Sequence, residues 1–174
     1  GFSIMGLVDA PGQIVGGQIL FKGQDLAKLS PAEMQAYRGN RIAMIFQDPM
    51  MTLNPVLRIE TQMVETILSH DSSVSKVDAH ARARDALGLV GISSPDERLR
   101  AYPHQFSGGM RQRVSIAIAM LNRPDLIIAD EPTTALDVTI QGQVIHEMQR
   151  LCQETKTALL WITHDLAVVA GIAE

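Results

Sequence analysis

Three short apolar runs predict buried strands of a parallel sheet. Residues 42–46, 126–129 and 158–162 each consist of hydrophobic side chains bounded by polar residues. A strand that is covered on both faces has such a continuous run rather than an alternation. Stretches with helical periodicity separate the runs, which favours an α/β fold with a mostly parallel sheet.

Helical periodicity occurs in three stretches, where apolar residues recur every three or four positions: 59–91, 110–121 and 140–151. The first stretch has two expected apolar faces, formed by Met63, Ile67 and Leu68 and by Val77, Ala81, Ala86 and Leu87. This helical block interrupts the alternation of strands and helices, as an inserted subdomain would. We therefore expect a core made of residues 1–47 and 123–174, with a helical subdomain over residues 48–122.

Two Ser-Pro-x-Glu sequences predict helix N-termini, because serine caps the first turn and proline fits its first position. They begin at Ser30 and Ser94, and the first of these helices is expected to run to Gly39. Closer to the N-terminus, residues 18–21 predict a strand that is followed by a turn around residues 22–25.

Length, composition and net charge favour a single globular domain that does not bind nucleic acid. The chain has 174 residues, 46% of them hydrophobic, which suits one domain with a substantial core. Its net charge of -4 argues against a nucleic-acid surface, where clustered basic residues are expected. Cys152 is the single cysteine, so no intramolecular disulfide can form. No apolar run approaches the roughly 20 residues of a membrane span. If the protein acts at a membrane, we expect it to do so by binding partner proteins.

Polar residues follow each of the three predicted strands. Gln47 follows the first, Asp130 and Glu131 the second, and Thr163 and His164 the third. The carboxyl ends of parallel strands lie side by side, and open α/β sheets bind ligands there. One carboxylate at that edge can hold Mg²⁺, and a second can orient or deprotonate a water.

A glycine-rich turn at residues 106–110 opens the next predicted helix. The free N–H groups of a helix N-terminus bind anions, and the two glycines let the backbone approach a phosphate closely. Together with the carboxylates at the strand ends, this turn suggests nucleotide hydrolysis.

These residues resemble the motifs of ABC-type ATPases. Residues 106–110 resemble the signature motif and 126–130 the Walker B strand. The other matches are the catalytic glutamate Glu131, the D-loop at 135–137, the Q-loop glutamine Gln47 and the switch histidine His164. More narrowly, residues 46–50, 53–55 and 102–105 are similar to the ATPase subunits of oligopeptide and dipeptide importers.

The resemblance implies a P-loop NTPase core with a short antiparallel β piece and an inserted helical subdomain. It implies two subunits that meet head to tail around two ATP molecules, at the cytoplasmic face of the cell membrane. Membrane-spanning permease subunits would dock on the helical subdomain, a solute-binding protein would act indirectly, and no nucleic acid is expected.

Residue roles also come from the resemblance. Ser107, Gly108 and Gly109 of one subunit would face the γ-phosphate held by the other, and Asp137 would couple the two sites. Asp130 would bind Mg²⁺ and Glu131 would act as general base. Gln47 would sense Mg²⁺ and water, and His164 would contact the γ-phosphate.

The sequence departs from the family pattern in two ways. Phe106 and Met110 replace the outer leucine and glutamine of the usual signature, while the serine and both glycines are intact. None of the four lysines, Lys22, Lys28, Lys76 and Lys156, follows a glycine as the P-loop lysine does. The resemblance therefore implies a chain that is incomplete at both ends, and we expect weak or no ATP binding and no hydrolysis by this stretch alone.

Three functions remain open from the sequence. The first is the ATPase subunit of a peptide-type importer. The second is a non-transport ABC ATPase, for example in DNA repair or translation, which the net charge and the 48–55 loop disfavour. The third is a hydrolysis-dead fragment or interaction module, which would keep the signature and switch residues without a phosphate cradle.

Overall fold

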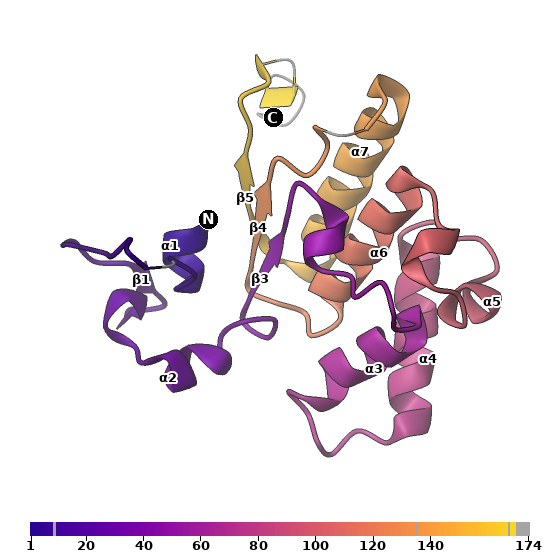
Figure 1. Ribbon diagram of the computed structural model, residues 1–174, viewed down its shortest axis with the longest axis horizontal. Helices are drawn as coiled ribbons and strands as arrows, with labels where there is room; N and C mark the ends of the chain where they lie inside the picture. Colours follow the sequence, from indigo (N-terminus) through magenta and orange to yellow (C-terminus); the bar gives the residue numbers. More distant parts are fainter. Residues whose placement is uncertain (9, 135, 167, 170–174) are drawn as a thin grey trace.

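A three-stranded parallel sheet forms the centre of the molecule, which is a computed structural model (Figure 1). The structure describes residues 1–8, 10–134, 136–166 and 168–169. The strands are β3 (Ile42–Ile45), β4 (Leu126–Asp130) and β5 (Ala158–Ile162), in the order β3-β4-β5. Both pairings are parallel, with Ile45 opposite Ala129 and Asp130 opposite Ile162, so the predicted parallel sheet is confirmed.

Helices lie on both sides of this sheet (Figure 1). Their bounds are α1 (Phe2–Met5), α2 (Pro31–Gln35), α3 (Ile59–Leu68), α4 (Lys76–Leu89), α5 (Pro95–Leu99), α6 (Gly108–Met120) and α7 (Val138–Thr155). The 3₁₀ turns are η1 (Leu26–Lys28), η2 (Pro49–Met51) and η3 (Pro103–Gln105). α6 packs against β3, α7 against α6, and α4 against α6, α3 and α5. None of the described helices is long and apolar enough to cross a bilayer.

The alternation of side chains along the strands divides the core into two clusters, because successive strand residues point to opposite faces. Ala43 and Ile45 of β3 join a large cluster with buried residues of α3, α4, α6 and α7. Ile42 and Met44 join a smaller cluster on the other face, with Met5, Leu26 and Met34. Both faces of β3 are therefore covered, which is why its sequence is continuously apolar.

A short β-hairpin lies beside α1, on the side of the sheet away from α6 and α7 (Figure 1). β1 (Leu20–Phe21) and β2 (Gln24–Asp25) pair in antiparallel fashion across Lys22 and Gly23, which have φ angles of 48° and 84°. Positive φ at both central residues is typical of a type I′ hairpin turn. The turn is thus shorter than predicted, since Gln24 and Asp25 belong to the second strand. The antiparallel β piece that the family resemblance implies is confirmed.

Two predictions about helix ends are wrong, one of a boundary and one of a cap. α2 ends at Gln35 instead of Gly39, because the carbonyl of Tyr37 accepts hydrogen bonds from the N–H groups of Arg41 and Ile42 and turns the chain into β3. α5 begins after Ser94 as expected, but Ser94 has φ 52° and its side chain makes no cap hydrogen bond. The capping box predicted there does not form.

Two predictions of burial also fail. α4 buries Ala79, Ala83 and Leu87, whereas Val77 is 79% exposed, so only part of the predicted apolar face reaches the core. β5 lies at one end of the three-strand order, and its Leu160 is 40% exposed instead of buried. Its place at the end of the order does not by itself explain this exposure, because β3 at the other end is buried at all four positions.

Candidate functional site

The polar residues after the strands meet at one edge of the sheet. Asp130 ends β4, and the N–H of Glu131 donates to the carbonyl of Ile162 in β5, at 2.9 Å. His164 follows β5 two residues after Ile162. Gln47 comes two residues after Ile45, whose partner in register is Ala129, and Glu131 comes two residues after Ala129. The expected convergence at the carboxyl edge is therefore present.

The closest contact within this group joins Glu131 to His164. Nδ1 of His164 lies 2.7 Å from Oε1 of Glu131, and the side chains are 71% and 26% exposed. Thr134 completes the arrangement, because its Oγ1 donates to Oε2 of Glu131 at 3.3 Å. Both carboxylate oxygens of Glu131 therefore have a partner, which fixes the direction of the side chain.

The backbone of Glu131 is unusual. Its φ is 47°, in the left-handed region that a residue with a Cβ enters at a cost of about 1–2 kcal/mol. Such a conformation persists where surrounding contacts determine it, and these are concentrated at functional sites. Here the hydrogen bond to Ile162 and the contact with His164 hold Glu131 in place from the neighbouring strand.

Asp130 supplies the other carboxylate of this edge. Among the described residues, no group of three or more His, Cys, Asp or Glu side chains converges as a metal site. Mg²⁺ does not need such a cage, since it is commonly bound by one or two carboxylates together with substrate phosphates and water. The carboxylate of Asp130 is one side chain at this edge that could bind Mg²⁺ in that way.

The glycine-rich turn opens α6. Ser107 is its N-cap, with Oγ accepting from the N–H of Met110 at 3.3 Å. A Cβ placed on Gly108 would meet no atom within 4 Å, whereas one on Gly109 would lie 3.0 Å from Cγ2 of Ile140. The backbone at Gly108 is therefore open to approach from outside.

Phe106 fixes the entry to this turn. It is 3% exposed, and the guanidinium carbon of Arg98 lies 5.8 Å from the centre of its ring. The Nε of Arg111 also donates to the carbonyl of Pro103 at 2.9 Å. The unusual first residue of the signature is thus an anchored core residue.

Not all the predicted site residues come together. Among the described residues, no hydrogen bond or ion pair joins Gln47 or Ser107 to Glu131 or His164. Asp137 is the N-cap residue of α7, but its side chain makes no cap hydrogen bond, and Ala135 of the predicted D-loop lies outside the described residues. The contact of Thr134 with Glu131 was not predicted, and its signal in the sequence is its place three residues after the glutamate.

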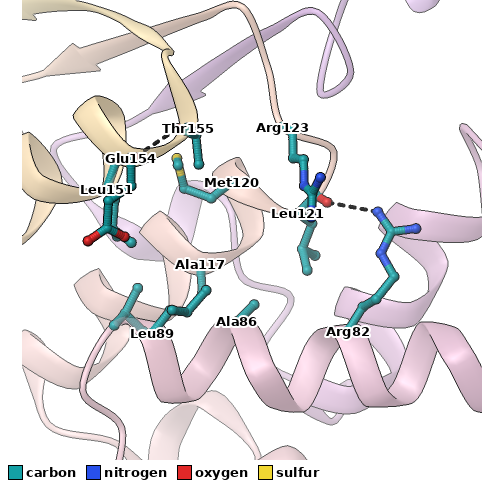
Figure 2. Close-up of a pocket in the computed structure, with 11 residues that line it drawn as sticks. Arg82, Ala86, Leu89, Ala117, Met120, Leu121, Arg123, Leu151, Glu154 and Thr155 are labelled. Atoms are coloured by element: carbon teal, nitrogen blue, oxygen red, sulfur yellow. Dashed lines mark hydrogen bonds between the residues drawn. The ribbon is translucent and has the colours of Figure 1, made fainter.

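A cavity of about 450 Å³ lies elsewhere, between α4, α6 and α7 (Figure 2). Its lining includes Leu121 and Arg123, which precede β4, and Thr155, which precedes β5. It is therefore at the amino ends of the strands, at the opposite end of the sheet from Asp130 and His164. In Figure 2, Arg82 points across to Leu121 and donates to its carbonyl at 3.0 Å.

Comparison with known proteins gives concordant matches. A protein-family model described as ABC transporter matches residues 3–134. The chain is 50% identical over 171 residues to a dipeptide transport ATP-binding protein of Lactococcus lactis, covering 98% of this chain and 49% of that protein. It is 51% identical over 173 residues to an oligopeptide transport ATP-binding protein of Bacillus subtilis, covering 99% and 48%. The chain thus spans about half the length of the curated relatives it matches.

Solved structures agree on the fold. A dimeric structure of the ATP-binding cassette MJ0796 bound to ADP and Pi superposes with a TM-score of 0.78 at 26% identity, covering 90% of this chain and 66% of that one. A second dimeric structure of MJ0796 gives a TM-score of 0.79 at 26% identity, covering 91% and 67%. The ABC ATPase fold predicted from the motifs is confirmed, and the chain belongs to the ABC transporter family.

Proposed function

We propose that this chain is part of an ATP-hydrolysing subunit that powers an ABC importer of peptides or similar small solutes, at the cytoplasmic face of the membrane. The observation that carries the proposal is the Glu131–His164 contact beside Asp130, at the carboxyl edge of a parallel sheet. The relatives named as dipeptide and oligopeptide transport ATP-binding proteins support the class of solute.

In this proposal Glu131 is the general base for the attacking water. Its carboxylate is held from two sides by Thr134 and His164, so it needs little reorientation during the reaction. Positioning of the nucleophile and stabilisation of charge account for most of the catalysis in phosphoryl transfer. His164 is exposed and would contact the γ-phosphate, and Gln47 would sense Mg²⁺ and water from the next strand.

Asp130 would hold Mg²⁺, directly or through water. The bound ion would neutralise charge on the β- and γ-phosphates. Ser107, Gly108 and Gly109 would serve the nucleotide of a second subunit in a head-to-tail dimer. The open backbone at Gly108 supports that arrangement, as do the dimeric structures of MJ0796. Asp137 would lie between the two sites.

The partners follow from the same arrangement. We assign residues 48–122 to a helical subdomain that docks on membrane-spanning permease subunits, and residues 1–47 and 123–174 to the ATPase core. A solute-binding protein would act only through the permease. Two apolar side chains in the segment after Gln47, Met51 and Val56, are 66% and 75% exposed. They suit an apolar contact with the permease.

Glu131→Gln in the full-length protein tests the proposal. Because the amide cannot accept the proton of water, we expect ATP hydrolysis to fall by at least about 100-fold, the scale of a lost general base, with ATP binding retained. Steady-state phosphate release and nucleotide binding would be measured on the same preparation. Hydrolysis at the wild-type rate would refute the role of Glu131.

A further inference from the structure

We propose that the contact between α6 and α7 links the two nucleotide sites of the dimer, with Arg113 as its central positioning residue. We call this contact the α6–α7 seam and define it by Gly109, Arg113, Ile140, Gln143 and Glu147. The inference rests on the proposed function, because the signature turn would serve one nucleotide and the residues before α7 the other.

The first part of the seam is a close steric contact. A Cβ on Gly109 would lie only 3.0 Å from Cγ2 of Ile140, so the side chain of Ile140 in the first turn of α7 packs directly against the backbone of Gly109 in the first turn of α6. Gly108 has no such neighbour within 4 Å. Gly109 therefore packs against α7 in addition to its place in the signature turn, whereas Gly108 only presents open backbone.

The second part is an ion pair that is largely buried. Nη1 of Arg113 lies 2.9 Å from Oε2 of Glu147, with the side chains 19% and 15% exposed. Nη2 of the same guanidinium donates to Oε1 of Gln143 at 3.3 Å. A planar guanidinium with several donors holds both partners in a fixed direction, which a lysine ammonium cannot reproduce.

The spacing places both parts on one face of each helix. Arg113 follows Gly109 by four residues, and Gln143 and Glu147 follow Ile140 by three and seven, so they lie in line along the two helices. Arg113 also donates to the carbonyl of Val90 at 2.8 Å, at the C-terminal end of α4. The seam thus joins the signature helix both to α7 and to the helical block.

This connection has a mechanical consequence. α7 begins directly after Asp137, only seven residues after Asp130 at the end of β4. A shift of the signature turn against one nucleotide is therefore transmitted through the seam to the chain that leaves the other site. Loss of the seam would leave each site able to react while reducing the cooperation between them.

The test uses Glu147→Gln and Arg113→Lys in the full-length protein assembled with its permease, with Glu154→Gln as matched control. Glu154 is also on α7, but its partner Arg150 is on the same helix, at 2.9 Å. Two coupled sites can raise the Hill coefficient for ATP to about 2, and we expect both seam variants to shift it toward 1. The control should keep the wild-type value, and unfolding curves would separate this effect from simple destabilisation.

Unchanged cooperativity in both seam variants would overturn the inference, as would a wild-type Hill coefficient near 1. Failure of the proposed function would look different, because Glu131→Gln would then hydrolyse ATP normally.

The steric contact between Gly109 and Ile140 has its own test, in the midpoints of unfolding. Gly109→Ala should destabilise more than Gly108→Ala, and the added change Ile140→Leu, which removes Cγ2, should restore the midpoint while Ile140→Val should not. Equal midpoints for the two alanine variants would contradict the contact.

Discussion

Glu131 combines a reactive side chain with a backbone that disfavours any side chain. Its φ of 47° suits glycine, yet the carboxylate makes contacts with His164 and Thr134. The left-handed backbone therefore costs local stability, while the contacts of the carboxylate hold it in one direction. Such strained residues are concentrated at functional sites.

Comparison of Glu131→Gly with Glu131→Ala measures the free-energy cost of the left-handed backbone at this position. Both variants remove the carboxylate, but only alanine keeps the cost of the left-handed backbone, so the glycine variant should be more stable by about 1 kcal/mol. Chemical denaturation of the nucleotide-free protein would give the difference. If the alanine variant were the more stable of the two, the backbone of Glu131 would have to relax when the side chain is lost.

At the scale of elements, two serines that directly precede helices behave differently. Ser107 caps α6 by accepting from the N–H of Met110, whereas Ser94 precedes α5 without a side-chain cap bond. The difference lies in the backbone, since Ser107 is extended at φ -65° and Ser94 is left-handed at φ 52°. A capping sequence thus forms its cap only where the chain enters the helix from an extended conformation.

We therefore expect Ser107→Ala to lower the free energy of unfolding by about 1 kcal/mol, the usual cost of a lost N-cap. Ser94→Ala is the control and should leave stability within about 0.5 kcal/mol. Both would be measured by denaturant unfolding without nucleotide. Equal losses for the two variants would show that the cap of α6 contributes nothing specific.

At the scale of the whole molecule, Asp125 ties together segments that are far apart in sequence. Its carboxylate accepts from Nζ of Lys22 in the hairpin turn and from Nε of Arg41 before β3. The hydrogen bond from Lys22, together with that from Arg41, lowers the pKa of Asp125 against the opposing effect of its partial burial. The amino end of the sheet and the hairpin are thus held by one side chain.

This shift has a defined dependence on pH. Because the pKa of Asp125 is lower in the folded protein than in the unfolded chain, its stabilising effect is complete above the unfolded value of about 3.9 and is lost as the pH falls below it. Asp125→Asn should therefore reduce the loss of stability between about pH 5 and pH 2, measured by urea unfolding at several pH values. Asp96→Asn, an exposed carboxylate on α5 outside this network, is the control and should leave the acid profile unchanged.

The sequence by itself determined the strands, the helical block and the family, because continuous apolar runs and short motifs depend on neighbouring residues. It also placed Gln47, Asp130 and His164 at one edge, since that follows from parallel pairing. Only the tertiary structure decided the exposure of β5, the left-handed backbone of Glu131 and the partners of Arg113. These features depend on contacts between residues that are 23 or more positions apart, whose geometry is set by packing rather than by local preference.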